Sequence, residues 1–196
     1  MLEYIAAAII SYLFGSIPTA YVVVKLATGK TIWEHGSRNV GALNVKRTTG
    51  SLGLALITIV VDVAKAMLAI WLVKTYFPSA VVLAPFFVVL GHNFPIWTGF
   101  RGGRGIAVLL ASSLALDPSF ALIWVALWLI GYLLTGYIAG GAMIAHVFTP
   151  AVQKLLLGYV SVPLVLAIIP VWIRYREKAD LIVSGRLRKH YWGEKK

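Results

Sequence analysis

Residues 91–105 read GHNFPIWTGFRGGRG, a polar, glycine-rich stretch that carries two basic side chains, Arg101 and Arg104. It lies between two apolar runs, 80–90 and 106–116, that contain no charged residue. Apolar runs of this kind are typical of segments within a bilayer, so the stretch between them is predicted to be a loop at a membrane surface. A basic loop in that place suits a phosphate group, because arginine offers forked, permanently charged donors.

The glycines of this loop strengthen the prediction of an anion site. Without a Cβ, Gly102 and Gly103 allow neighbouring backbone N–H groups to turn toward one anion. Gly105 stands where the next helix is expected to begin, and the free N–H groups of a helix N-terminus also attract phosphate. An ordinary cytoplasmic loop needs arginines for topology, but it does not need the glycines, His92 or Pro95.

Composition places the chain in a membrane. Of its 196 residues, 60% are hydrophobic and only 13% are charged, which is too apolar for an ordinary soluble domain. There is no cysteine, which excludes disulfides and thiolate chemistry. The net charge of +11 comes from basic residues that flank apolar runs. Anionic lipid head groups and phosphorylated substrates are therefore the expected partners, and nucleic acid is not.

The apolar runs predict an all-α, polytopic membrane protein with one transmembrane domain over residues 1–196. The first run is interrupted by Gly-Ser-Ile-Pro at 15–18, where Pro18 is expected to kink it. Because more apolar runs follow, we interpret it as a first span and not as a cleaved signal peptide. The seven runs are 2–24, 51–73, 79–90, 106–116, 119–134, 138–152 and 155–173.

Several of these runs are short, because about 20 helical residues are needed to cross the hydrocarbon core. The run 106–116 is therefore a candidate for a re-entrant or half-span helix. Counting every run gives seven transmembrane helices. Counting 106–134 as a re-entrant hairpin gives five, with the same orientation.

Basic residues predict which side each loop occupies. Segments 25–50, 91–105 and 174–196 hold five, two and eight of the 18 lysines and arginines. Placed on one face, they make that face cytoplasmic by the positive-inside rule, with the N-terminus outside and the basic tail, 174–196, and C-terminus inside. The three segments can then meet at one cytoplasmic pocket.

Several familiar catalytic motifs are missing. The seven acidic residues include no pair placed to hold a metal on one helix face, so no metal site is expected. None of the four histidines has an acidic residue five positions later, which excludes the histidine-aspartate motif of common glycerolipid acyltransferases. There is no Gly-x-Ser-x-Gly elbow either.

A second polar loop, 35–47, offers further ligands for a phosphorylated molecule. Its side chains can form hydrogen bonds, its glycine permits close backbone approach, and its basic residues can hold a second anion. A capped turn before the next helix explains the same residues equally well. The residues in question are Ser37, Arg38, Asn39, Gly41, Asn44, Lys46 and Arg47.

Asp62 and Lys65 lie three residues apart, on one face of a helix inside the membrane. Ionisable groups there are costly and usually pair with each other or line a wet cavity. Either a structural ion pair or a ligand role fits, so we assign both residues to the support of the site. We interpret His146 as a packing or interfacial residue, and His190 as a solvated residue of the tail.

Taken together, these motifs resemble the bacterial acyl-phosphate:glycerol-3-phosphate acyltransferase family, which are small integral membrane enzymes of about this length. The resemblance covers most of the chain, through four ordered motifs: residues 15–18, the loop 37–44, Asp62-x-x-Lys65, and the loop 91–105. It implies seven spans, an external N-terminus and an active site at the cytoplasmic face of the bacterial cell membrane.

The resemblance also implies a reaction. A fatty acyl group passes from an acyl phosphate to the 1-hydroxyl of sn-glycerol 3-phosphate, giving lysophosphatidate and phosphate in the first step of phospholipid synthesis. An acyl phosphate is already activated, so no cofactor and no covalent intermediate are implied; binding and orientation suffice. A soluble enzyme that makes the acyl phosphate is a possible partner.

Position by position, Ser37 and Arg47 match family active-site residues, and Arg101 and Arg104 match two lysines of its phosphate loop. Asn39, Gly41, Asn44 and His92 match as well. We hypothesise that Arg104 with the Gly102 and Gly103 amides holds one phosphate and that Arg47 holds the other. Ser37 orients the reacting groups, and the base is either His92 or the phosphate of the donor.

The chain departs from the family pattern at a few positions. Arg38, Leu43 and Ala66 stand where the family usually has Gly, Thr and Gly, and in the tail Tyr175 and Lys178 stand where it has His and Asn. Two other functions stay open. One is a transporter or binding protein for an organic phosphate, and the other is a homologue of low activity with a regulatory role.

Overall fold

The computed structural model describes residues 1–183, with side chains as far as Arg176, and every regular element in that part is helical. The side chain of Lys178 and the tail 184–196 with His190 lie outside the described residues. Between residues 1 and 183, nine α-helices are joined by short connections that include three 3₁₀ turns, η1 (Ile32–Glu34), η2 (Pro78–Leu83) and η3 (Ile96–Thr98). The α-helices are α1 (Leu2–Ser16), α2 (Thr19–Thr28), α3 (Ala42–Thr49), α4 (Leu52–Tyr76), α5 (Ala84–Asn93), α6 (Ile106–Leu116), α7 (Pro118–Thr135), α8 (Ile138–Leu157) and α9 (Val162–Val183).

In the part of the chain that the structure describes, four segments are long and apolar enough to cross a membrane: Leu2–Thr28, Leu52–Tyr76, Pro78–Thr98 and Pro118–Thr135. This confirms an all-α chain with membrane-compatible helices, while the count of seven spans and their orientation remain predictions. The helix α6 has 11 residues and is about 16 Å long at 1.5 Å per residue, about half the hydrocarbon thickness.

Two predicted boundaries were wrong. Gly91 and His92 belong to the last turn of α5 and not to the loop, because the helix continues to Asn93 before Phe94 leaves helical geometry. The helix predicted to begin at 155 begins at Val162, because α8 continues to Leu157. Gly158 ends α8 in a left-handed conformation, with φ of 78° and its N–H donating to the Lys154 carbonyl.

The predicted break at residues 15–18 is confirmed. The helix α1 ends at Ser16 and α2 starts at Thr19, with Ile17 and Pro18 between them. Proline has no N–H and clashes with the preceding turn, so the helix stops there, and the Ile17 carbonyl accepts a hydrogen bond of 3.0 Å from the Thr19 N–H at the start of α2. The same carbonyl also accepts a hydrogen bond of 2.8 Å from the Lys65 ammonium on α4.

Helices α1 and α5 cross at two glycines. A Cβ on Gly15 would collide with the Val88 carbonyl of α5, and a Cβ on Gly91 would collide with the Tyr12 carbonyl of α1. Small residues at a crossing let two membrane helices approach closely, where van der Waals packing holds them together. The close crossing brings the end of α5, with His92, beside the break that follows α1.

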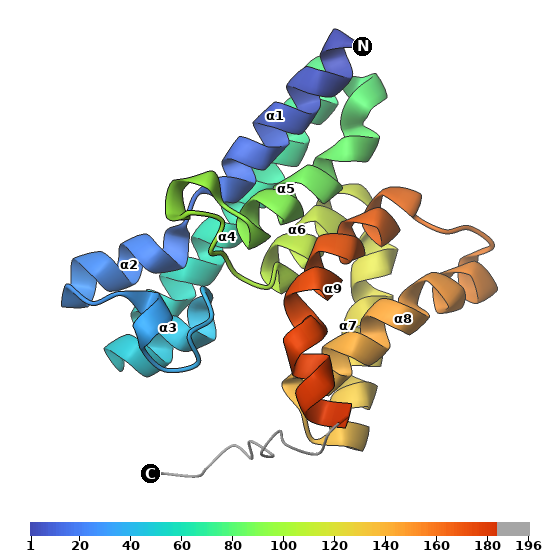
Figure 1. Ribbon diagram of the computed structural model, residues 1–196. Coiled ribbons are helices and arrows are strands. Elements are labelled where there is room, and N and C mark those ends of the chain that lie inside the picture. The colour runs from blue at the N-terminus through green and yellow to red at the C-terminus, as the bar shows by residue number, and fades with distance from the viewer. Residues whose placement is uncertain (184–196) are drawn as a thin grey trace.

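Figure 1 shows α1, α4 and α5 grouped in one part of the molecule and α7, α8 and α9 in the other, with α6 between them. The short helices α2 and α3 lie to one side, where they pack on each other and on α4. The largest buried side chains of the shared core come from α6, α7 and α9: Leu109, Phe120, Trp124, Leu164 and Tyr175. Helix α9 thus closes the bundle against α5 and α6.

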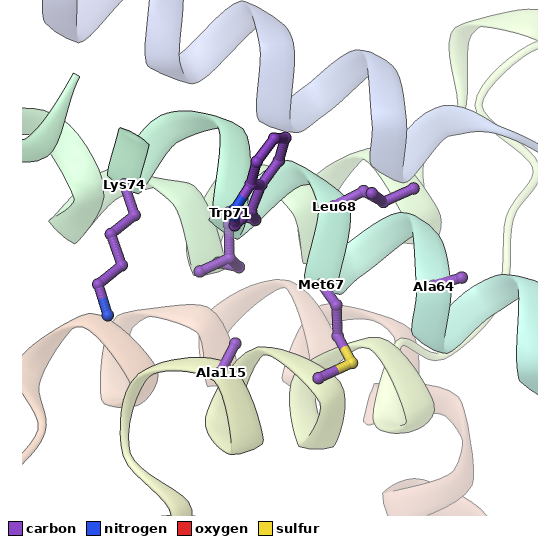
Figure 2. A pocket seen from close by; sticks show the side chains of 7 residues that line it. Ala64, Met67, Leu68, Trp71, Lys74 and Ala115 are labelled. Atoms are coloured by element: carbon purple, nitrogen blue, oxygen red, sulfur yellow. The ribbon is translucent and has the colours of Figure 1, made fainter. Parts of the chain in front are cut away.

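An apolar groove of about 540 Å³ runs along the outer face of α4. Figure 2 shows Met67, Trp71 and Lys74 projecting from α4, with Ala115 of α6 nearby. Those three α4 side chains are exposed, whereas Asp62 and Lys65 of the same helix are buried. The groove is therefore not lined by Asp62 or Lys65.

Two loops contain residues in left-handed backbone geometry that glycine adopts more easily. Arg38 has φ of 58° and Phe100 has φ of 63°, and they are the non-glycine residues of positive φ in the described part of the chain. Each follows a left-handed glycine at a short distance, Gly36 and Gly99. Such geometry is strained for side chains with a Cβ, and strained residues cluster at functional sites.

Replacing Gly91 by alanine is expected to lower the free energy of unfolding by about 1–3 kcal/mol, because the new methyl group presses on the backbone of α1. Thermal unfolding of the purified protein in detergent measures the loss. Gly53→Ala is the matched control, since Gly53 is exposed and a Cβ there would lie 3.7 Å from its nearest neighbour, Ser51 Oγ. Equal midpoints for the two variants would contradict a tight crossing.

Replacing Arg38 by glycine is expected to raise the free energy of unfolding by about 0.5–1 kcal/mol. Left-handed geometry costs other residues about 1–2 kcal/mol, and the greater freedom of glycine in the unfolded chain offsets part of the gain. Arg38→Ala removes the same charge without relieving the strain, so it separates the two effects. A rise in Arg38→Ala as large as in Arg38→Gly would show that charge, and not geometry, is responsible.

Candidate functional site

Asn44 organises the first polar loop from inside. Its side chain is 1% exposed, and its Oδ1 accepts a hydrogen bond of 2.7 Å from the Ser37 N–H. Its Nδ2 donates to the Ile32 and His35 carbonyls, at 3.1 Å each. The three partners lie between Ile32 and Ser37, so Asn44 holds the first polar loop to η1 and stabilises its shape.

The other predicted residues of this loop lie at its surface. Ser37 is exposed, Asn39 is half-buried, and Arg47 is exposed on α3. Gly41 caps the N-terminus of α3, where its carbonyl accepts from the Asn44 and Val45 N–H groups. The loop therefore ends in a turn before α3 without a side-chain cap, and Ser37 and Arg47 are exposed on either side of that turn.

Gly103 is the point where the two polar loops meet. A Cβ there would collide with the His92 ring at Nε2 and with the Val40 carbonyl of the first loop. A second link lies beside it, because Trp33 Nε1, in η1 just before the first polar loop, donates to the Arg101 carbonyl at 3.2 Å. The segments 35–47 and 91–105, predicted separately, therefore form one continuous surface.

The hypothesis that both glycine amides hold a phosphate needs correction. The Gly103 N–H donates to the His92 carbonyl at 3.0 Å, so it is not available to a ligand. Gly102 and Gly103 instead allow the loop to lie directly on the end of α5. Gly105 is the N-cap of α6 as predicted, with φ of 81°, and the first turn of α6 offers N–H groups without helical partners.

Two arginines on this surface differ in their environment. Arg101 has an exposed side chain, while Arg104 is half-buried. The Arg104 guanidinium lies over the ring of Tyr175 on α9, 5.2 Å from its centroid. Arg174, the preceding residue of α9, donates from Nε to the Gly103 carbonyl at 3.2 Å and from Nη2 to the Gly102 carbonyl at 2.8 Å.

Asp62, Lys65 and His92 form a buried polar cluster beneath the loops. Lys65 Nζ lies 2.8 Å from Asp62 Oδ1 and 3.1 Å from His92 Nδ1, and it also donates to the Ile17 carbonyl. An ammonium group has three N–H donors, and it faces three acceptors here. His92 Nδ1 is therefore assigned as the acceptor, with the ring proton on Nε2, toward Gly103. The predicted ion pair between Asp62 and Lys65 is confirmed, and its ammonium group contacts the His92 ring at Nδ1.

Sequence reasoning missed the contribution of α9 to the site. Tyr175 was noted only as a departure from a family pattern, and Arg174 only as a basic residue of the tail. The signal was the sequence Arg-Tyr-Arg at 174–176, which places a cation and an aromatic ring on successive helical positions. His146 packs between the rings of Trp124 and Tyr175, with centroids 5.3 and 6.2 Å away, which confirms its packing role.

A polar cluster near the start of α7 is a structural cap. Asp117 accepts from the Phe120 N–H, from Ser119 and Tyr159, and from Gln153 Nε2 at 2.7 Å. Burial alone would raise the pKa of Asp117, but these hydrogen bonds hold the pKa below its ordinary value. Its acceptor positions are occupied within the protein, so this cluster is not the candidate site.

Known proteins match the chain over most of its length. Residues 5–185 match the family described as glycerol-3-phosphate acyltransferase. A glycerol-3-phosphate acyltransferase of Rhizobium etli is 38% identical over 178 residues, which cover 90% of this chain and 85% of that protein. One of Paramagnetospirillum magneticum is 38% identical over 183 residues, covering 93% and 90%.

Solved structures agree with the sequence relatives. The fold is similar to a crystal structure of PlsY (YgiH), an integral membrane glycerol 3-phosphate acyltransferase, in its glycerol 3-phosphate form. The TM-score is 0.82 at 28% sequence identity, with 96% of each chain covered. The lysophosphatidic acid form of PlsY gives a TM-score of 0.80. The apolar helices, the joined polar loops and these matches agree, and the chain belongs to the glycerol-3-phosphate acyltransferase family.

Proposed function

We propose that this protein transfers a fatty acyl group from an acyl phosphate to the 1-hydroxyl of sn-glycerol 3-phosphate. The hydroxyl oxygen bonds to the acyl carbon, the bond between that carbon and the phosphate oxygen breaks, and lysophosphatidate and inorganic phosphate leave. The observation that carries the proposal is the junction at Gly103, where two loops that each bear arginines form one surface. Both substrates carry a phosphate, so two cationic positions on one surface suit them.

The two loops supply different groups for the two phosphates. Arg104 stands at the N-terminus of α6, where its charge adds to the helix N–H groups and holds one phosphate. Arg47 holds the other from α3, beside the exposed hydroxyl of Ser37, which orients the acceptor. Asn39 and Arg101 lie on the same surface and add hydrogen bonds. Holding two reactants in line removes much of the entropic barrier to their reaction.

The geometry of His92 favours the phosphate of the donor as the base. His92 Nδ1 faces the Lys65 ammonium at 3.1 Å, so that nitrogen is already engaged as an acceptor. Its Nε2 carries the proton and lies against Gly103, so neither ring nitrogen is free to accept a proton from a hydroxyl. A phosphate oxygen of the acyl phosphate accepts that proton, and it leaves as protonated inorganic phosphate.

The proposed reaction takes place at the cytoplasmic face of the bacterial cell membrane. The basic segments 25–50 and 91–105 belong to that face under the positive-inside rule, in a topology of seven spans. The acyl chain of both donor and product can stay among membrane lipids while the phosphates remain in water. A soluble enzyme that produces acyl phosphate would deliver the donor at this face.

Purified protein in detergent is expected to release phosphate from palmitoyl phosphate only when sn-glycerol 3-phosphate is present. Arg104→Ala should lower kcat/KM by at least about 100-fold, because an aligned charged donor is lost. Lys74→Ala removes an exposed cation from the far end of α4 and should retain full activity. Folded protein that releases no phosphate, yet carries an organic phosphate into proteoliposomes, would support transport in place of acyl transfer.

His92→Asn is expected to retain transfer within about tenfold, because an essential general base contributes about 10²–10⁴-fold. The asparagine oxygen can still accept from Lys65, so the buried cluster keeps its third acceptor. The pH dependence of kcat, measured for both proteins, should be the same. Loss of an ionisation from the profile together with a drop of about 100-fold or more would make His92 the base.

A further inference from the structure

The contact between Arg104 and Tyr175 joins a loop residue to a helix about seventy positions later. The guanidinium carbon of Arg104 lies 5.2 Å from the centroid of the Tyr175 ring. Arg104 is half-buried, while Tyr175 is only 1% exposed. A cation over an aromatic face is attracted by the negative charge of the π-system, and more strongly where water is excluded.

The Tyr175 ring is fixed in place by the core behind it. It meets the ring of His146 at 6.2 Å and an interplanar angle of 69°, and His146 in turn packs on Trp124. All three side chains are buried. A ring held in this way cannot turn aside, so it gives Arg104 a rigid surface to lie on.

The residue before Tyr175 holds the backbone of the same loop. Arg174 donates to the carbonyls of Gly102 and Gly103 from two of its nitrogens. Successive side chains of a helix point about 100° apart. Arg174 therefore contacts the glycine carbonyls, while Tyr175, the next residue, contacts the Arg104 guanidinium. Both the path of the loop and the direction of its arginine are therefore set by α9.

We propose that Tyr175 is a positioning residue, which aims the Arg104 guanidinium at a substrate phosphate through the face of its ring. This inference rests on the proposed function, in which Arg104 holds one of the two phosphates. A long arginine side chain loses rotamer freedom when it binds, and a ring that already restricts it reduces that loss. A planar guanidinium stacks on a ring better than an ammonium, which suits arginine to position 104.

Fluorination of the ring tests this inference with little change in ring shape, and the phenylalanine variant, which lacks the Tyr175 hydroxyl, is the reference of the series. Phenylalanine, 4-fluorophenylalanine and 3,4,5-trifluorophenylalanine are introduced at position 175, and fluorine progressively removes negative charge from the ring face. The KM of one substrate should rise stepwise across the series, by roughly tenfold in total. The KM of the other substrate and the thermal midpoint in detergent should change little. The substrate that responds is the one whose phosphate Arg104 holds.

The same series at Phe120 is the matched control, because Phe120 is fully buried in the same core cluster. A response at position 175 and none at position 120 would support the inference. Equal KM values for both substrates throughout the series at 175, or an equal response at 120, would overturn it.

A second readout separates this inference from the proposed reaction. The concentration of inorganic phosphate that half-maximally raises the thermal midpoint is measured for each fluorinated protein and for Arg104→Ala. If no variant transfers an acyl group, the proposed reaction fails, but the phosphate concentration should still rise along the series at 175. If the half-maximal phosphate concentration stays constant along the series at 175 while Arg104→Ala differs from the parent, the role of Tyr175 is overturned, whether or not the protein transfers an acyl group.

Discussion

The Lys65 ammonium is the constraint on which the rest of the site depends. Burying a charge in a membrane protein is costly unless all of its donors find partners. Lys65 meets this requirement with the Ile17 carbonyl, the Asp62 carboxylate and His92 Nδ1. The acceptors come from the break after α1, from α4 and from α5, so one charge fixes three segments relative to each other. The break favours this arrangement, because in an intact helix the Ile17 carbonyl would accept from the backbone N–H four residues later.

Close backbone contacts connect this buried cluster to the two polar loops at the surface. The α1–α5 crossing seats His92 at the end of α5, and the His92 ring supports Gly103. Gly103 then touches Val40 of the first loop, whose shape Asn44 maintains from inside. The close contacts require glycine at positions 91 and 103, and the shape of the first loop requires Asn44, whose side-chain amide is hydrogen-bonded at both its oxygen and its nitrogen. The arginines of the two loops, of which Arg47 and Arg101 are exposed and Arg104 is half-buried, are therefore attached to a backbone that close contacts hold in place.

The sequence alone was sufficient for features that depend on near neighbours. Pro18 ends a helix by its own chemistry, Gly105 opens α6, and Asp62 pairs with Lys65 because they are three positions apart. Contacts between distant segments could not be predicted in this way. No local pattern shows that the Gly103 N–H is taken by His92, or that Tyr175 lies under Arg104. His92 itself was misplaced, because a polar residue at a helix end resembles the loop that follows it.

The hold of Arg174 on the glycine carbonyls has a consequence for how the protein is made. Chains are synthesised from the N-terminus, so both polar loops emerge and can meet while α9 is still unmade. Until α9 is inserted, the loop lacks the donors that fix its carbonyls and the ring beneath its arginine. The insertion of α9 therefore completes the order of the two loops. An incomplete chain in the membrane would hold every residue of the two loops and still lack an ordered site.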